Sequence, residues 1–374
     1  MRKVELILKP VSYDCNLSCG YCFYKKTSRL YPGRSHLMRE NVLEKLICEC
    51  MTYSDGGPCI FCWQGGEPLL AGISFFQKVV EFQKEYGRPG QIVSNSVQTN
   101  ATLLNTEWIR FFKKYNFFIG VSLDGPPQVH NHYRQYASGR GSFEEVVAGI
   151  NLLAEGGVDF NILSTIGKET AYSPQEIYKY FLSRGLYYLQ FIPAVDRENQ
   201  QIADFSITPA QYGNFLCRLF DVWWNHGNPF VSIRLFDNIL EILLGQESNS
   251  CAFKDHCSEY LVAEFNGDIY PCDFFVNKEW KLGNISKVSI EKLFQKARLR
   301  FGNLKKIVSS DCKNCQWNFI CHNGCLWFRW IRNARVEEKE YLCDSYRQFF
   351  PYAIKRLEKL RDSILFRTSE SKSF

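Results

Sequence analysis

No segment of the 374-residue sequence is both long enough and free enough of charge to cross a bilayer. The short apolar stretch at the N-terminus contains Glu5 and Lys9, and these charges make it a poor signal peptide. The lack of both signals predicts a soluble, cytoplasmic protein that does not bind a membrane.

A strong excess of one charge is also missing. The chain has 45 Lys and Arg residues against 39 Asp and Glu residues, and the basic residues are dispersed apart from short pairs such as Lys25-Lys26. Proteins that bind nucleic acids usually gather basic residues on one face, so we expect no nucleic-acid partner. Repeats and low-complexity tracts are missing too, except for a polar tail at residues 367–374.

Cysteine, in contrast, is abundant, with sixteen residues in the chain. In a small secreted domain such a number would suggest disulfides. In a chain of this length without an export signal, the cysteines are better explained as metal ligands that are kept reduced. The composition therefore predicts a metalloprotein that works under anaerobic conditions.

The most informative motif is Cys15-x3-Cys19-x2-Cys22, which is followed at once by Phe23 and Tyr24. An iron–sulfur cube normally takes four cysteine ligands, so three thiolates leave one iron with an open position. Zinc ligands or unrelated buried cysteines are the alternatives, although zinc modules usually show paired Cys-x2-Cys knuckles. The spacing resembles the signature of the radical S-adenosylmethionine (SAM) superfamily, in which the open iron chelates SAM.

From Val4 to about Ile192, short β-rich runs alternate with helical patterns, which predicts about six strand–helix units and a parallel α/β sheet. Six units suit a partial (β/α)6 barrel of the TIM type, as in radical SAM enzymes. The predicted strands are Val4 to Leu8, Cys59 to Trp63, Ile92 to Gln98, Phe117 to Leu123, Phe160 to Ile166 and Tyr187 to Ile192.

The residues that could carry chemistry follow the ends of these strands, where barrels and open α/β sheets bind ligands. The cysteine loop follows the first strand, Gln64-Gly65-Gly66-Glu67-Pro68 the second, Asn100 the third and Asp124-Gly125-Pro126 the fourth. The glycine pair resembles the Gly-Gly-Glu-Pro motif of radical SAM enzymes, whose backbone holds the SAM amino group. An ordinary strand-to-helix turn is the alternative.

A change of character near residue 230 predicts a second domain. A bridging helix is expected from Pro209 to Trp224, and the chain beyond it has clustered cysteines and a hairpin turn at Asn266-Gly267. A last helix, Ser345 to Phe366, places Phe349, Tyr352, Ala353 and Leu357 on one amphipathic face. We therefore expect domains at residues 1–230 and 231–366, followed by the tail.

Eight cysteines in this second domain would serve two further cubes of four ligands each, which leaves only Cys48, Cys50, Cys59, Cys62 and Cys217 as buried packing residues. Their Cys312-x2-Cys315-x5-Cys321-x3-Cys325 run resembles the SPASM module of radical SAM peptide-modifying enzymes. A zinc ribbon is the alternative, because spacing alone does not distinguish zinc from iron–sulfur ligation.

With these motifs in order, including Tyr270-Pro271-Cys272-Asp273, the chain resembles the anaerobic sulfatase-maturating enzymes over nearly its whole length. Those enzymes convert a cysteine or serine of a sulfatase, within a Cys/Ser-x-Pro/Ala-x-Arg motif, into Cα-formylglycine. The resemblance implies that a 5′-deoxyadenosyl radical removes hydrogen from Cβ and that auxiliary clusters take the second electron. It also implies a low-potential donor such as flavodoxin or ferredoxin.

The resemblance also assigns roles to individual residues. Three [4Fe-4S] clusters are implied, held by Cys15, Cys19 and Cys22, by Cys251, Cys257, Cys272 and Cys325, and by Cys312, Cys315, Cys321 and Cys343. The positions that match SAM contacts are Tyr21, Gly66, Ser122, Arg134 and Val195. Asp273 is the candidate base for the substrate proton, since it adjoins a cluster ligand.

Some sequence features leave the identity of the substrate undecided. Ala101 stands where the family often has glycine, and His322-Asn323-Gly324 replaces a Gly-Gly pair before Cys325. Gln64 and Tyr24 could contact the peptide backbone or act as packing residues. The rivals are another SPASM peptide modifier, such as a thioether-forming maturase, and a non-catalytic zinc or iron–sulfur module that serves as an electron-transfer or scaffold protein. About twelve irons per chain would fit three cubes, whereas zinc without sulfide would support the scaffold.

Overall fold

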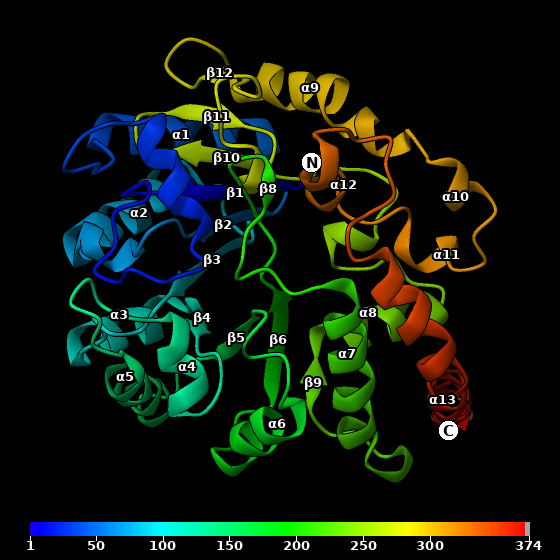
Figure 1. Cartoon of the computed structure of the whole chain (residues 1–374). Coiled ribbons are helices and arrows are strands. Elements are labelled where there is room, and N and C mark those ends of the chain that lie inside the picture. The colour runs from blue at the N-terminus through cyan, green and yellow to red at the C-terminus, as the bar shows by residue number, and fades with distance from the viewer. Residues whose placement is uncertain (371–374) are drawn as a thin grey trace. The chain divides into compact units, whose positions relative to one another are not determined.

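The computed structural model describes residues 1–370 (Figure 1). By their packing, these residues divide into two compact units that interleave along the chain. The first unit consists of Met1–Leu123, His130–Asn161 and Cys257–Asn303; the second consists of Asp124–Val129, Ile162–His256 and the chain from Leu304 on. The sequence domains at 1–230 and 231–366 stay a prediction, because packing units and evolutionary domains need not coincide.

The first unit is built on a mainly parallel sheet with the strand order β12-β11-β10-β1-β2-β3-β4. β10, β1, β2, β3 and β4 pair in parallel, whereas β11 and β12 add an antiparallel edge. The bounds are β1 Val4–Lys9, β2 Cys59–Trp63, β3 Val93–Thr99, β4 Phe118–Ser122, β10 Leu261–Glu264, β11 Asp268–Tyr270 and β12 Gly283–Asn284.

The alternation of buried and half-buried residues along β1 shows that helices cover one face of this sheet. Val4, Leu6 and Leu8 are buried, whereas Glu5 and Ile7 between them are only half-buried, because successive side chains of a strand point to opposite faces. Figure 1 shows helices on the outer side of these strands. They are α1 Glu40–Ser54, α2 Ile73–Tyr86, α3 Thr106–Tyr115 and α5 Phe143–Glu155, with α9 Ile290–Arg300 and the short α4 Pro127–Tyr133 completing the set.

An aromatic cluster fills the space between strands and helices of the first unit. Trp63 of β2 meets Phe76 of α2 edge to face, with 5.6 Å between ring centroids, and Phe76 meets Trp108 of α3 in the same way at 5.4 Å. Edge-to-face contacts of this kind add to the burial energy of the rings. The helices therefore give the sheet a rigid support. The functional side chains lie in the loops that follow the C-terminal ends of the strands.

The second unit contains the parallel strands β5 Phe160–Ile166, β6 Tyr188–Pro193 and β9 Ser232–Ile233, and the small β7 Arg197–Glu198 and β8 Gln201–Ile202 hairpin. The main helix of this unit, α7 Pro209–Trp224, packs against α13 Cys343–Glu370. Its other helices are α6 Pro174–Ser183, α8 Arg234–Leu243, α10 Ser310–Lys313, α11 Asn318–Cys321 and α12 Leu326–Asn333.

The expected face of the last helix needs one correction. Phe349, Ala353 and Leu357 are buried as predicted, but Tyr352 is 43% exposed and its hydroxyl donates to Asp221. Helix α13 also continues to Glu370, so the first residues of the predicted polar tail are helical. Residues 371–374 of that tail lie outside the described residues. Within residues 1–370, no helix has the length and apolar character that a bilayer span requires.

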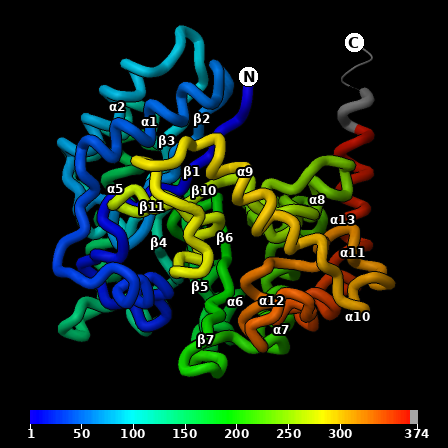
Figure 2. Tube along the Cα trace, turned by 90° about the horizontal axis from the view of Figure 1, so that it is seen from above, coloured from blue at the N-terminus to red at the C-terminus, as the bar shows by residue number. Residues whose placement is uncertain are grey.

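The predicted α/β barrel architecture is confirmed, and each of the six predicted strands is present within one residue of its expected bounds. The pairing of β10 with β1 could not be read from the sequence. Figure 2 shows β10 and β11 beside β1, and the register aligns Lys9 with Glu264. A late segment of the chain therefore extends the sheet that the N-terminus begins.

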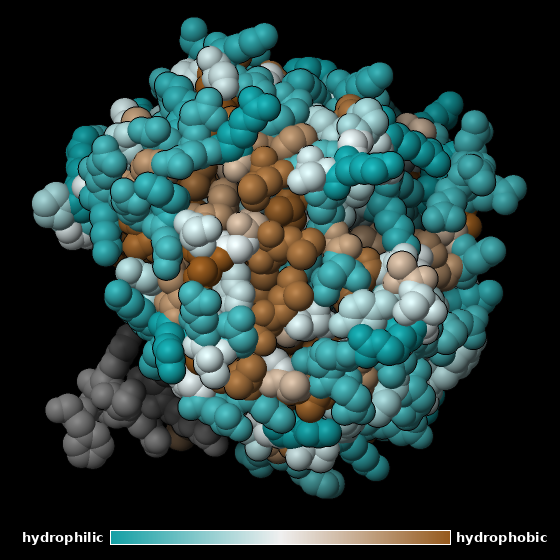
Figure 3. Space-filling view, turned by 90° about the vertical axis from the view of Figure 1, so that its left-hand side faces the viewer, coloured by the Kyte–Doolittle hydropathy of each residue, from teal (hydrophilic) through white to brown (hydrophobic). Residues whose placement is uncertain are grey.

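Figure 3 shows a band of apolar side chains on one face of the molecule, bordered by polar residues. Contiguous apolar surface of this kind is unusual on a protein that has no partner.

Candidate active site

The loop between β1 and the short helix η1 Phe23–Arg29 carries the three-cysteine motif. The Ser18 amide donates to the Gln135 carbonyl at 2.7 Å, and the Gly20 amide donates to the Tyr133 carbonyl at 2.9 Å. Cys15 is exposed, whereas Cys19 and Cys22 are half-buried. Backbone hydrogen bonds thus fix the loop that carries the three cysteines.

Two N–H groups point at the sulfur of Cys15. The Leu17 amide lies 3.3 Å from Cys15 Sγ, and Asn100 Nδ2 lies 3.7 Å from the same atom. Burial raises the pKa of Cys15 to about 12, and the Leu17 amide only partly offsets this effect, so iron must displace the thiol proton on binding. Three thiols on one loop fit an iron–sulfur cluster, and Asn100 lies beside one of them.

The glycine pair after β2 packs directly on this cysteine loop. The Gly66 amide donates to the Ser12 carbonyl at 2.7 Å, and a Cβ atom at Gly66 would lie only 1.9 Å from the Asp14 carbonyl oxygen. Gly65 has a φ of +124°, a conformation that residues with side chains rarely adopt. The sequence suggested close approach to a ligand; the structure shows close approach to the cluster loop itself.

Glu67 links the loops that follow β2 and β3. Its fully buried carboxylate accepts hydrogen bonds from the Leu69 amide at 3.1 Å, the Thr99 hydroxyl at 2.7 Å and the Asn100 amide at 2.8 Å. Burial raises the pKa of Glu67 to about 7, because the three donors only partly offset the cost of burying the charge. Glu67 holds Asn100 in place.

Four of the five predicted SAM contacts belong to the first unit. Arg134 is buried, and its guanidinium carbon lies 5.4 Å from the centre of the Tyr21 ring; the Ser122 hydroxyl accepts a bond of 2.9 Å from Gln98 Nε2. A buried guanidinium beside the cysteine loop suits a carboxylate ligand, and the role of Arg134 as a SAM contact stays a prediction. Val195 belongs to the second unit, and its role stays a prediction.

Asp273 is a buried carboxylate with defined partners. It begins the short helix η5 Asp273–Phe275, which is separated from β11 by Pro271 and Cys272, and it is only 9% exposed. Lys9 Nζ lies 2.7 Å from Oδ1, while the Tyr24 hydroxyl and Gln64 Nε2 donate to Oδ2 at 2.6 Å and 3.1 Å. One ion pair and two hydrogen bonds thus fix the position of the Asp273 carboxylate.

Lys9 and Glu264 form the support of Asp273. Lys9 is 1% exposed and also lies 3.6 Å from Glu264, which is completely buried. Burial alone would lower the pKa of Lys9, but the carboxylates of Asp273 and Glu264 outweigh it and raise the pKa above its usual value. The ammonium group is therefore a permanent counter-ion, and it also lies 4.5 Å from the centre of the Tyr24 ring.

Sequence reasoning missed Lys9 and Glu264 as functional residues. Lys9 was noticed only as a charge in an apolar N-terminal stretch, and no motif marks Glu264. A lysine at the C-terminal end of a buried strand is the signal that was present, because such a residue needs a charged partner. The identity of the partner depended on the β1–β10 pairing.

Within the second unit, four late cysteines line one pocket together with Glu340: Cys312, Cys315, Cys321 and Cys343. These are the residues predicted for one auxiliary cluster. Burial raises the pKa of Cys321 to about 12, with a further contribution from Glu340, so a metal must displace its proton on binding. Among the side chains that the structure describes, those of residues 1–366, no group of three or more His, Cys, Asp or Glu is arranged around a single ion.

The His322-Asn323-Gly324 departure also has a structural explanation. All three residues are left-handed, with φ values of 42°, 65° and 72°, and a Cβ atom at Gly324 would overlap the Glu340 carboxylate. Glu340 accepts a bond of 2.8 Å from the Cys325 amide. The one glycine that is retained is therefore the one that this contact requires.

The other departure from the family pattern shows the same conformation. Ala101 has a φ of +62° and is almost fully buried, so the glycine that relatives often carry there would relieve strain. The alanine keeps the backbone path and leaves Asn100 in place.

The remaining cysteine predictions have mixed outcomes. Cys257 and Cys272 belong to the first unit, and Cys251 and Cys325 to the second, so their grouping as one cluster stays a prediction. Of the five cysteines expected to be buried packing residues, Cys50 and Cys59 are buried. The other three, Cys48, Cys62 and Cys217, are only half-buried.

Comparison with protein families agrees with these sites. The profile of the radical SAM superfamily matches residues 10–181, and the profile of an iron–sulfur cluster-binding domain, SPASM, matches residues 251–316. A serine-type anaerobic sulfatase-maturating enzyme of Bacteroides thetaiotaomicron is 36% identical over 97% of this chain and 92% of its own length. A cysteine-type enzyme of Clostridium perfringens is 37% identical over 97% of this chain and its whole length.

Solved structures give the same result. The structure described as native anSMEcpe with bound AdoMet and Cp18Cys peptide has a TM-score of 0.90 and 37% identity, and the match covers 97% of this chain and 99% of that one. Streptococcus suis SuiB bound to its precursor peptide SuiA has a TM-score of 0.64 at 15% identity, over 91% of this chain and 76% of that one. SuiB therefore shares the fold.

The raised pKa of Glu67 predicts a particular pH dependence of stability. A carboxylate with a higher pKa in the folded than in the unfolded chain stabilises the fold at low pH, and this contribution is lost as pH rises toward 7. Between pH 5.5 and 7.5 the contribution of Glu67 to the free energy of unfolding falls by about 2 kcal/mol. Anaerobic denaturation at both pH values should show a smaller decrease in the free energy of unfolding for Glu67→Gln than for the unmodified protein. Equal decreases in the two proteins would contradict this interpretation of Glu67.

Proposed function

Since the chain belongs to the anaerobic sulfatase-maturating enzymes, which are radical SAM enzymes, we propose that it oxidises an active-site cysteine or serine of a sulfatase to Cα-formylglycine. The observation that carries the proposal is the buried Asp273, placed directly after Cys272 and bonded to Lys9, Tyr24 and Gln64. Such a carboxylate can accept the proton that the substrate side chain must lose.

The chain contains iron–sulfur clusters and uses SAM as cofactor, in keeping with both family matches. Our proposal is that there are three [4Fe-4S] clusters, with the eleven cysteine ligands grouped as the family resemblance implies. When bound, the cluster of the Cys15 loop and SAM supply the radical that removes a hydrogen atom from Cβ of the target residue. Tyr21, Gly66, Ser122, Arg134 and Val195 are the proposed SAM contacts.

The residues around Asp273 have separate tasks in this proposal. Asp273 takes the proton from the thiol or hydroxyl group of the target as the side chain is oxidised. Lys9 fixes the position of Oδ1 through an ion pair, and Glu264 holds Lys9. Tyr24 and Gln64 orient Oδ2 through hydrogen bonds of 2.6 Å and 3.1 Å, so the base faces the substrate in one orientation.

The proposed substrate is a sulfatase polypeptide that presents a Cys/Ser-x-Pro/Ala-x-Arg motif. We further propose a low-potential electron donor such as flavodoxin or ferredoxin, a cytoplasmic location, and no binding to nucleic acids or membranes. The identity to the serine-type and cysteine-type relatives is nearly the same, 36% and 37%. Both kinds of target peptide therefore belong in the test.

A second candidate is another SPASM peptide modification, such as thioether formation. The fold shared with SuiB is the observation that favours it. The much higher identity to sulfatase-maturating enzymes, over the whole chain, favours formylglycine formation. The scaffold alternative is excluded, because the chain belongs to a family of enzymes.

Mass spectrometry tests the proposed function. Cysteine-type and serine-type sulfatase peptides are incubated anaerobically with the enzyme, SAM and dithionite. We expect a cysteine to lose hydrogen and sulfur and gain oxygen, and a serine to lose two hydrogens, because both become the same aldehyde. A thioether-forming enzyme would instead leave the sulfur in a peptide that has lost two hydrogens, and this product would contradict the proposal.

Replacement of the proposed base gives a sharper prediction. Asp273→Asn should lower the rate of formylglycine formation by about 10²- to 10⁴-fold, since the amide cannot take the substrate proton. Iron content should be unchanged, and SAM should still be cleaved. The matched control is Asp159→Asn, which makes the same chemical change at an exposed position of the same unit. A full rate in Asp273→Asn would exclude Asp273 as the base.

A further inference from the structure

We propose that Asn323 donates a side-chain hydrogen bond to the cluster in the cysteine-lined pocket of the second unit, and thereby raises the reduction potential of this cluster. The proposed ligands of this pocket cluster are Cys312, Cys315, Cys321 and Cys343. The inference rests on the proposed function to the extent that these four cysteines must hold an iron–sulfur cluster. It goes further because it concerns how readily the cluster takes up an electron.

Asn323 lies in the wall of the pocket, together with the four cysteines. It follows Cys321 by two residues, and its backbone is left-handed, with a φ of 65°. The backbone amide of Asn323 donates a hydrogen bond to the sulfur of Cys321. One N–H group of Asn323 is thus already directed at a proposed ligand.

The side chain of Asn323 contains an unsatisfied polar atom. Its Oδ1 is buried and has no hydrogen-bond partner among the described residues, which is unfavourable for a polar atom. The sulfides and thiolates of a cluster are acceptors, so they cannot satisfy an oxygen. Turning the amide by half a rotation exchanges Oδ1 with the donor Nδ2. A bound cluster therefore favours the orientation in which the amide donates to it.

Arg329 fixes the loop that carries Asn323. The Arg329 side chain is only 1% exposed, and its Nε and Nη1 atoms donate bonds of 2.8 Å to the carbonyls of Asn323 and Ile307. The Gly324 amide donates to the Cys321 carbonyl at 2.6 Å. The backbone is thus held on both sides of the Asn323 side chain, which keeps the amide beside the pocket.

The charges around the pocket act in the same direction as the proposed hydrogen bond. Lys305 and Arg329 are both 1% exposed, and the charges of both act on Glu340, which lines the pocket. A cluster with four thiolate ligands is an anion, and reduction adds a further negative charge. Nearby cations and hydrogen-bond donors both favour the reduced form, so an amide donor from Asn323 should make reduction easier.

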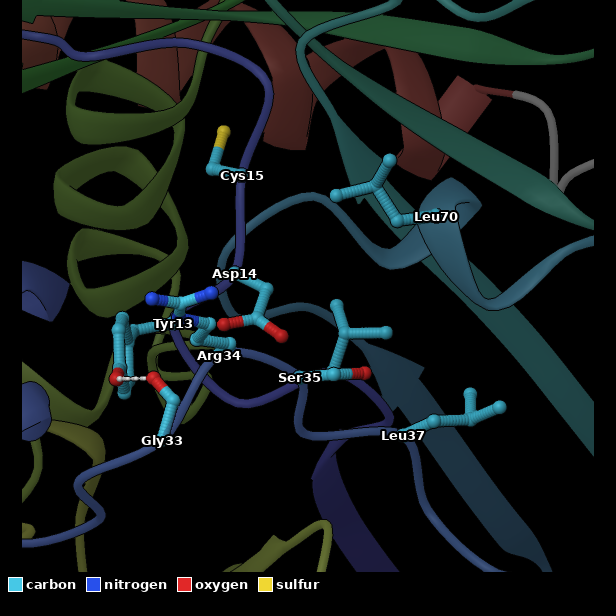
Figure 4. Close-up of a pocket in the computed structure, with 9 residues that line it drawn as sticks. Tyr13, Asp14, Cys15, Gly33, Arg34, Ser35, Leu37 and Leu70 are labelled. Atoms are coloured by element: carbon cyan, nitrogen blue, oxygen red, sulfur yellow. Dashed lines mark hydrogen bonds between the residues drawn. The ribbon is translucent and has the colours of Figure 1, made fainter.

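The Cys15 loop of the first unit shows a similar contact. Asn100 Nδ2 lies 3.7 Å from Cys15 Sγ. Figure 4 shows this sulfur pointing away from the charged groups of Asp14 and Arg34, which line the depression beside it. A neutral amide thus lies next to a proposed ligand sulfur there, which is the arrangement that we propose for Asn323 at the pocket cluster.

The test measures the reduction potential of the pocket cluster. The protein and Asn323→Gly are titrated anaerobically with dithionite, which supplies the electron that the cluster takes up, and the reduced cluster is followed by electron paramagnetic resonance. The signal of the pocket cluster is the one that Cys312→Ala removes. In Asn323→Gly the equilibrium constant for uptake of one electron should fall about tenfold, which lowers the potential by about 59 mV.

Two further variants give the matched comparison. Glycine suits a left-handed backbone, so His322→Gly, at the neighbouring residue with a φ of 42°, is the control. His322 is not among the residues that line the pocket, and its replacement should change the equilibrium constant less than twofold. Asn323→Asp keeps the size of the side chain but places a carboxylate beside the anionic cluster, so it should lower the potential more than Asn323→Gly does.

Three outcomes would overturn the inference. The first is an unchanged potential in Asn323→Gly. The second is a shift to a more positive potential, because Asn323 would then act by excluding water, which stabilises the reduced cluster. The third is an equal shift in His322→Gly, which would assign the effect to the backbone of the loop.

Failure of the proposed function gives a different result. If target peptides are not converted but the signal that Cys312→Ala removes is present, the proposed function fails, and the potential still decides the role of Asn323. If no signal depends on Cys312, the assignment of the pocket cluster and the inference about Asn323 are both wrong.

Discussion

The active site depends on a close contact between two stretches of backbone. The loop after β2 lies against the cysteine loop so tightly that Gly66 has no space for a Cβ atom, which would lie 1.9 Å from the Asp14 carbonyl oxygen. The same contact places Glu67 under the loop after β3, and Glu67 in turn holds Asn100 near the Cys15 sulfur. Three loops that follow three neighbouring strands are thus fixed as one body, and three thiols are presented from a rigid base.

A buried charge network forms the second part of the site. Lys9 lies between Asp273 and Glu264, and none of the three is appreciably exposed. Removing one partner of a buried ion pair usually costs more than the pair contributes, because an unpaired charge is left behind. The network therefore holds the Asp273 carboxylate in one position. The proposed removal of a proton from the substrate requires a carboxylate fixed in this way.

The sequence predicted the parts of this account that local pattern encodes. Alternating apolar residues located β1 to β6, and the cysteine spacing located the loop and the second set of ligands. The bridging helix was placed well because Thr208 forms a capping box with Gln211 and the helix ends at the left-handed Asn225. Such signals act over a few residues and need no tertiary information.

Other features depended on contacts between distant segments. The partnership of Lys9 and Glu264 follows from the pairing of β1 with β10, which joins residues more than 250 positions apart. Tyr352 has the spacing of a core residue, but its hydroxyl finds Asp221 and stays at the surface. Nothing in the sequence around Arg134 indicates that its side chain is buried. In each case tertiary packing, which a short window of sequence does not contain, decided the outcome.

The central claim is that the Cys15 loop holds a cluster with one open iron that binds SAM. Electron paramagnetic resonance of the dithionite-reduced protein, recorded with and without SAM, tests it most directly. The account predicts that SAM changes the signal of one cluster, and that the change is missing in Cys15→Ala while the signals of the other clusters remain. A spectrum that SAM leaves unaltered in the unmodified protein would contradict the account.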